Sequence, residues 1–137
     1  MNISEKITSV FIIDDNEVDL FIEERVVASL KIAEKIDCFS SPLRAFERLK
    51  KMLNEEEPLP SLIFLDVNMP GMNGFQFLDA LQPLMAKKKQ RVKVFIVSSS
   101  DSLRDKEMAK NYPEVVEYVV KPLTDDWLSS FFIYKYE

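Results

Sequence analysis

The chain has 137 residues, of which 47% are hydrophobic and 30% are charged, and its formal net charge is -5. This length suits one globular domain with a sizeable core, and the negative charge argues against a broad nucleic-acid-binding surface. The single cysteine and the lack of histidine exclude an internal disulfide, a histidine metal site, a His-based catalytic triad and a phosphohistidine donor within this chain. No apolar run approaches the roughly 20 residues of a membrane span, so we expect a cytoplasmic protein without membrane insertion.

Short apolar runs alternate with longer helical patterns from one end of the chain to the other. Their β-branched and aromatic residues, at strand length, predict five strands. The first, third and fourth runs are almost continuously apolar, which is typical of parallel strands that are covered on both faces. The predicted strands are residues 9–13, 35–39, 62–65, 93–97 and 117–120.

Helical patterns follow each predicted strand. Asn16, Ser41 and Thr124 can cap helices with their side-chain oxygens, and Pro42 suits the first position of the second helix. Pro83 falls inside the third helical pattern, where we expect a kink or an early end. The predicted helices are residues 16–30, 41 to about 54, 74 onward, 103–110 and 125 to near the C-terminus.

Two of these helices have apolar stripes that should face the core. The stripes follow the helical spacing of three and four residues, which places their members on one side of each helix. Their predicted members are Leu43, Phe46, Leu49 and Leu53 on the second helix, and Phe75, Leu78, Leu81 and Met85 on the third. Five strand–helix units predict an α/β fold with a doubly wound parallel sheet and right-handed crossovers.

Polar residues recur where the predicted strands end. Asp14 and Asp15 follow the first strand, Asp66 the third, Ser98 the fourth and Lys121 the fifth. Because the carboxyl ends of parallel strands lie along one edge of a sheet, we expect these side chains to meet in one pocket.

This set of side chains predicts a particular chemistry. Three aspartates that lie close together resist joint ionisation, and a divalent cation with oxygen ligands, such as Mg²⁺, relieves the repulsion. With the carboxylates screened in this way, a carboxylate oxygen can attack phosphorus. Lys121 would supply positive charge to the phosphoryl oxygens and Ser98 a hydroxyl donor. The residues therefore suit phosphoryl transfer to an aspartate.

Four motifs in this order resemble the receiver domain of bacterial two-component response regulators. They are Phe11-Ile12-Ile13-Asp14-Asp15, Leu65-Asp66-Val67-Asn68-Met69-Pro70-Gly71-Met72-Asn73-Gly74, Ile96-Val97-Ser98-Ser99 and Tyr118-Val119-Val120-Lys121-Pro122. The resemblance spans essentially the whole chain and is greatest to stand-alone, chemotaxis-regulator-like receivers. It implies a flavodoxin-like sheet of order 2-1-3-4-5 with five helices, formed by a single domain over residues 1–137 without an output domain.

The resemblance also implies roles for residues at the carboxyl edge. Asp66 matches the phosphoacceptor. Asp15 matches the direct Mg²⁺ ligand, Asp14 the ligand that acts largely through water, and Asn68 the position whose backbone carbonyl completes the metal site.

Four further positions match residues that respond to the phosphoryl group in this family. Lys121 matches the catalytic lysine, and Ser98 the catalytic and switch hydroxyl that turns toward the phosphoryl group. Tyr118 matches the aromatic switch that moves inward with it. Pro122 matches the residue that is preceded by a cis peptide.

We therefore expect a receiver that takes a phosphoryl group from a sensor histidine kinase or a histidine phosphotransfer protein and then changes its affinity for a downstream protein target. A phosphorylation-dependent homodimer is compatible with this interpretation, and direct nucleic-acid binding is not expected. The alternatives are a phosphorelay intermediate, a receiver-like scaffold that works without phosphorylation, and a haloacid-dehalogenase-type phosphohydrolase. The last would need an acid where Asn68 stands.

The aromatic C-terminal segment allows two interpretations. Its rings cannot all face inward on one helix, so either most of them pack in the core or some form a contact patch for a partner. The aromatic residues are Trp127, Phe131, Phe132, Tyr134 and Tyr136.

Overall fold

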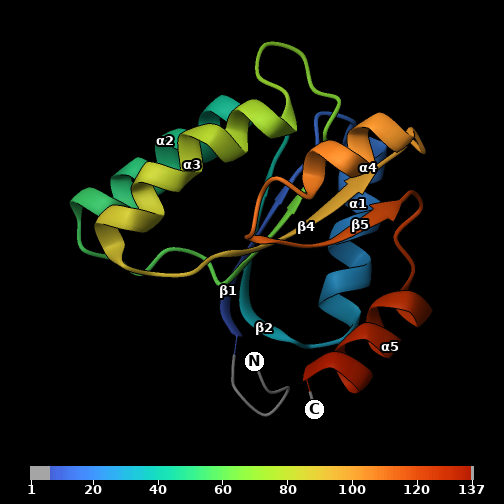
Figure 1. The fold of residues 1–137 in the computed structure, drawn as a ribbon. Helices are drawn as coiled ribbons and strands as arrows, with labels where there is room; N and C mark the ends of the chain where they lie inside the picture. The colour runs from blue at the N-terminus through green and yellow to red at the C-terminus, as the bar shows by residue number, and fades with distance from the viewer. Residues whose placement is uncertain (1–6, 137) are drawn as a thin grey trace.

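The structure is a computed structural model that describes the backbone of residues 7–136 and the side chains of residues 7–132. Five parallel strands form one sheet in the order β2-β1-β3-β4-β5, as predicted, and helices cover both faces (Figure 1). The strands are β1 Ile7–Ile13, β2 Ala33–Phe39, β3 Leu62–Leu65, β4 Lys93–Ser98 and β5 Val115–Val120.

The helices divide between the two faces of the sheet. Residues of α2 and α3, with the end of α4, pack in one core cluster, whereas α1 and α5 pack in the other. Figure 1 shows α2 and α3 together on one side of the strands and α1 and α5 on the opposite side. The helices are α1 Glu17–Ser29, α2 Pro42–Asn54, α3 Gly74–Lys88, α4 Leu103–Ala109 and α5 Asp125–Tyr136.

The central strands supply both clusters because their side chains alternate between faces. On β1, Phe11 and Ile13 face the α2–α3 cluster, whereas Val10 and Ile12 face the α1–α5 cluster. All four side chains are fully buried. The continuous apolar runs predicted to be covered on both faces are therefore confirmed, and they fix the register that brings the ends of β1 and β3 side by side.

The predicted helix caps are confirmed. The backbone N–H groups of Asp19, Arg44 and Trp127 donate to the side-chain oxygens of Asn16, Ser41 and Thr124, at 3.0, 3.3 and 3.2 Å respectively. These caps satisfy N–H groups that have no partner within the helix.

Two predictions about the helices are wrong, one of them in part. Leu43 does not face the core: it is 54% exposed, and the buried residues of α2 are Pro42, Ala45, Leu49 and Met52. With Pro42 at the first position, the inward face follows the 45–49–52 spacing, and Leu43 falls outside it. Of the kink or early end expected at Pro83, the early end is not found, because α3 continues to Lys88. Pro83 lies on the exposed side of the helix.

The aromatic segment packs mainly as core. The rings of Trp127, Phe131 and Phe132 lie 4.9 to 6.2 Å from the ring of Phe95 on β4, measured between centroids. Phe131 and Phe132 are buried, and Trp127 is half-buried. The side chains of Tyr134 and Tyr136 lie outside the described residues. Among the described helices, none combines the length and the apolar character that a membrane crossing requires.

Candidate functional site

The three predicted aspartates meet at the carboxyl edge of the sheet. Strands β1 and β3 pair with Ile13 opposite Leu65, so the residues that follow them, Asp14 and Asp66, are neighbours. The backbone N–H of Asp66 donates to the carbonyl of Ile13 at 3.0 Å and extends this pairing by one residue. One carboxylate oxygen from each of Asp14, Asp15 and Asp66 lies within 4.8 Å of the other two.

The aspartates differ in their exposure to solvent. Asp14 and Asp66 are 0% and 4% exposed, whereas Asp15 is more open to solvent. Backbone N–H groups approach both buried carboxylates: that of Asn16 donates to Asp14 Oδ1 at 2.9 Å, and that of Asn68 to Asp66 Oδ1 at 3.4 Å. Burial and then the charge of Asp14 raise the pKa of Asp66 to about 6. Ionised Asp66 is therefore destabilised by its surroundings.

Lys121 supplies the compensating positive charge. It follows β5, and its backbone N–H donates to the carbonyl of Ser98 at 2.8 Å, which ties the two strand ends together. Its Nζ lies 2.8 Å from Asp14 Oδ2 and 3.6 Å from Asp66 Oδ2. Burial lowers the pKa of Lys121, but the hydrogen bonds to Asp14 and Asp19 and the charge of Asp66 outweigh it, so the pKa lies above its ordinary value. The Lys121–Pro122 peptide is cis, as the resemblance implied.

Ser98 and Tyr118 are linked through Ser100 rather than directly. Ser98 is fully buried at the end of β4, and its Oγ accepts from the backbone N–H of Ser100 at 3.1 Å. The hydroxyl of Tyr118 donates to the carbonyl of Ser100 at 2.9 Å. The hydroxyl of Ser100 in turn donates to Asp105 of α4 at 2.7 Å. A rotation of Ser98 would therefore change a hydrogen bond at the start of the segment that leads to α4.

Two acids of α1 at this site were missed by the sequence reasoning. Asp19 Oδ2 lies 2.8 Å from Lys121 Nζ. Glu23 is buried beside Asp14, and burial followed by the charge of Asp14 raises the pKa of Glu23 to about 9. The signal that could have found them is the i, i+4 spacing, which puts Asp19 and Glu23 on one face of α1.

The aspartate cluster fits a hard divalent cation. Its ligand atoms are carboxylate oxygens, the type that Mg²⁺ prefers, and they lie close enough to share one ion. The unfavourable ionisation of Asp66 is the repulsion that such an ion would relieve.

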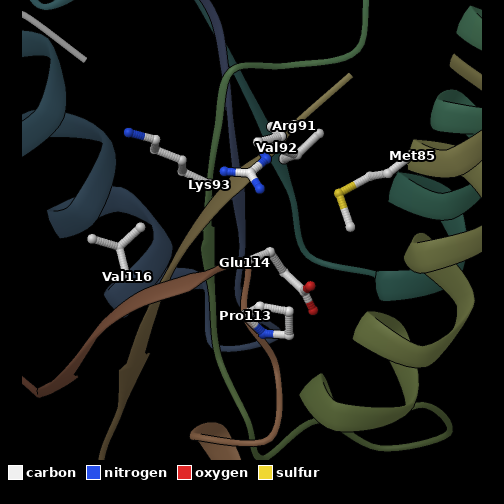
Figure 2. Close-up of a pocket in the computed structure, with 7 residues that line it drawn as sticks. All are labelled: Met85, Arg91, Val92, Lys93, Pro113, Glu114 and Val116. Atoms are coloured by element: carbon white, nitrogen blue, oxygen red, sulfur yellow. The ribbon is translucent and has the colours of Figure 1, made fainter. Parts of the chain in front are cut away.

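A cavity lies at the opposite end of the sheet. It has a volume of about 330 Å³ and lies between α3 and the amino ends of β4 and β5 (Figure 2). None of the predicted site residues lines it. The lining residues are Met85, Arg91, Val92, Lys93, Pro113, Glu114 and Val116.

Comparisons with known proteins agree with this geometry. A two-component response regulator from Cytophaga hutchinsonii has a crystal structure that is 31% identical, with a TM-score of 0.82 over 94% of this chain and 96% of that chain. The CheY chain of a CheX–CheY–BeF3–Mg²⁺ complex from Borrelia burgdorferi shares the fold at 20% identity and a TM-score of 0.71, over 90% of this chain and 84% of that one.

Curated proteins extend the comparison to longer relatives. An uncharacterized response regulatory protein from Shewanella oneidensis is 28% identical over 118 residues. The chain spans 29% and 44% of the lengths of the two curated relatives it matches. Residues 10–131 match the family described as the response regulator receiver domain. The chain therefore belongs to the response regulator receiver domain family and is a module of two-component signalling rather than a conventional enzyme.

Proposed function

We propose that Asp66 accepts a phosphoryl group from a phosphohistidine on another protein, and that this event switches a protein-binding surface. The observation that carries the proposal is the convergence of Asp14, Asp15, Asp66 and Lys121 at one edge of the sheet. Burying two of these aspartates costs free energy. A role in binding or chemistry explains that cost better than a role in stability does.

The aspartates and one carbonyl would hold a magnesium ion. Asp15 and Asp66 would bind it directly, Asp14 largely through water, and Asn68 through its backbone oxygen. The ion would supply charge neutralisation, which lets an anionic phosphodonor approach three carboxylates. A Mg²⁺-containing complex of the related CheY chain supports this choice of metal.

In the transfer itself, an oxygen of Asp66 attacks phosphorus in line with the leaving group. The bond from phosphorus to the imidazole nitrogen of the donor breaks, and that nitrogen takes the electron pair. Because the other ring nitrogen carries a proton, the donor leaves as a neutral imidazole. The product is an acyl phosphate on Asp66. Lys121, whose Nζ lies 3.6 Å from Asp66 Oδ2, would pair with a phosphoryl oxygen as negative charge builds up there.

The response is a shift between two conformations. Ser98 would turn toward the phosphoryl group and Tyr118 would move inward, and their shared contact with Ser100 offers a route to α4. Four large apolar side chains are exposed on α4 and β5, which supports this face as the one that a downstream protein recognises. They are Leu103, Met108, Val116 and Val120.

The partners follow from this chemistry. The donor would be a sensor histidine kinase or a histidine phosphotransfer protein, since the chain has no histidine of its own. The same site could return the phosphoryl group to a histidine phosphotransfer protein, which would make the domain a relay intermediate. The chain would act as a single domain over residues 1–137.

A small phosphodonor tests the proposal. Incubation with acetyl phosphate should add one phosphoryl group to the intact protein, as read by mass spectrometry, only when Mg²⁺ is present. Asp66→Asn should remove the addition, and Lys121→Ala should slow it. Phosphorylation that persists in Asp66→Asn would place the acceptor elsewhere, and a wild-type protein that ignores the donor would support a phosphorylation-independent scaffold.

A further inference from the structure

The ammonium group of Lys121 is shared among three carboxylates from three parts of the fold. Its Nζ lies 2.8 Å from both Asp14 Oδ2 and Asp19 Oδ2, but 3.6 Å from Asp66 Oδ2. Lys121 donates a hydrogen bond to Asp19 and forms a close ion pair with Asp14, whereas Asp66 lies beyond hydrogen-bond distance. The lysine is therefore held on the α1 side of the pocket, away from the carboxylate that would receive the phosphoryl group.

The position of Asp19 does not depend on Lys121. Asp19 lies in the first turn of α1, where its backbone N–H donates to the side chain of the N-cap residue Asn16 at 3.0 Å. Asn16 is itself tied to the site because its backbone N–H donates to Asp14 Oδ1. The capped start of α1 thus holds the backbone of Asp19, from which its carboxylate reaches the lysine.

The Lys121–Asp19 ion pair is partly buried. The side chain of Lys121 is 13% exposed and that of Asp19 is 33% exposed. Charges that are partly withdrawn from water interact more strongly than fully exposed pairs and are screened less by salt.

We propose that Asp19 is a positioning residue that retains the Lys121 ammonium on α1 and thereby restrains phosphorylation of Asp66. The inference rests on the proposed function of Asp66. It adds a function for the start of α1: any partner that displaces Asp19 from Lys121 would release the lysine toward the phosphoryl group. Asp19 itself touches no reacting atom in this scheme.

The first test compares phosphorylation rates with acetyl phosphate at saturating Mg²⁺. Asp19→Asn keeps the size of the side chain but removes its charge, and the rate should rise by about threefold to tenfold. Asp19→Glu restores the charge and should return the rate toward that of the wild type. Glu17→Gln is the matched control, because Glu17 is exposed in the same turn of α1 and its loss removes the same charge. Its rate should stay near that of the wild type.

The second test shows whether the effect acts through Lys121. In a Lys121→Gln background, Asp19→Asn should leave the residual rate unchanged. A metal-free readout accompanies it: the side-chain ¹⁵Nζ resonance of Lys121, assigned by its loss in Lys121→Gln, should shift in Asp19→Asn and not in Glu17→Gln.

The outcomes separate this inference from the proposed function. A slower Asp19→Asn variant that is folded, equal acceleration by Glu17→Gln, or acceleration that persists without Lys121 would each overturn the restraint. Absence of any phosphorylation in the wild type would instead refute the role of Asp66. Whether or not the protein is phosphorylated, an unchanged Lys121 ¹⁵Nζ resonance in Asp19→Asn would refute the ion pair.

Discussion

The two ends of the sheet bury different kinds of side chain. At the carboxyl end, the structure buries Asp14, Asp66 and Ser98, with Glu23 of α1 beside them; these are the four buried polar or charged side chains among the described residues. At the amino end, the buried side chains are apolar, as at Leu62 and Val92.

At the amino end, the side chain of Gln90 pairs both backbone polar groups of Leu59. The side chain of Gln90 accepts from the backbone N–H of Leu59 at 2.8 Å and donates to the carbonyl of the same residue at 2.7 Å. The carboxyl end instead holds acids whose ionisation is opposed by burial and by one another. The difference indicates that one end stabilises the fold, whereas the other gives up stability for a reactive site.

The largest effect on folding should come from the amino end. Leu62→Ala removes a side chain that is 1% exposed at the start of β3, and a cavity of this kind costs about 2–5 kcal/mol. Urea denaturation measures the loss. Phosphorylation by acetyl phosphate should persist at temperatures where the variant is folded. A loss well below 1 kcal/mol would show that this end is not the stabilising one.

At the carboxyl end, removing a charge should raise the free energy of unfolding rather than lower it. The pKa of Asp66 is raised from 3.8 to about 6, so the folded state binds its proton more tightly than the unfolded state does. The stability that this proton contributes is present below about pH 4 and is lost as the pH rises through about 6. Asp66→Asn should therefore stabilise the metal-free protein at pH 7.5 by roughly 3 kcal/mol.

Urea denaturation of metal-free samples at pH 4 and 7.5 checks this sign. The gain from Asp66→Asn should be largest at the higher pH and should shrink when Mg²⁺ is added, because the ion stabilises the wild type more than the variant. Glu47→Gln, at an exposed position of α2, is the control and should change little at either pH. Destabilisation by Asp66→Asn at pH 7.5 would contradict the comparison between the two ends.

A smaller effect near neutral pH is expected at Glu23. Its pKa is raised from 4.5 to about 9, so it stays largely protonated at pH 7, and its contribution to stability is lost as the pH rises through about 9. Glu23→Gln keeps a hydrogen-bond donor beside Asp14 and should change stability little at pH 7. Between pH 8 and 10, thermal unfolding should show a flatter pH dependence than in the wild type. An unchanged slope would mean that Glu23 does not titrate there.

Sequence reasoning found the sheet because its strands are apolar on both faces. The run from Val10 to Ile13 has no polar alternation, which fixed it as a central strand and placed Asp14 at the shared edge. Strand starts were less accurate: β1 begins at Ile7 and β2 at Ala33, two residues before the predicted starts. Backbone pairing extends beyond the apolar stretch there, and side-chain patterns do not report it.

The parts of the site that strand ends contribute were predictable, whereas the part that a helix contributes was not. Asp66 and Lys121 each follow an apolar strand, so topology alone brings them together. Asp19 and Glu23 lie on a helix whose exposed face is also rich in acids, and only the rotation of α1 about its axis determines which of them face Lys121 and Asp14. That rotation depends on packing, as the misplaced Leu43 of α2 also shows.

The most direct test of the central claim locates the phosphoryl group without mutating the site. Wild-type protein is treated with acetyl phosphate and Mg²⁺, and then with sodium borohydride, which reduces an aspartyl phosphate to homoserine. Peptide mass spectrometry then identifies the altered position. Our account predicts homoserine at position 66, and only in samples that contained Mg²⁺. Reduction at position 14, 15 or 19, or at no aspartate at all, would contradict it.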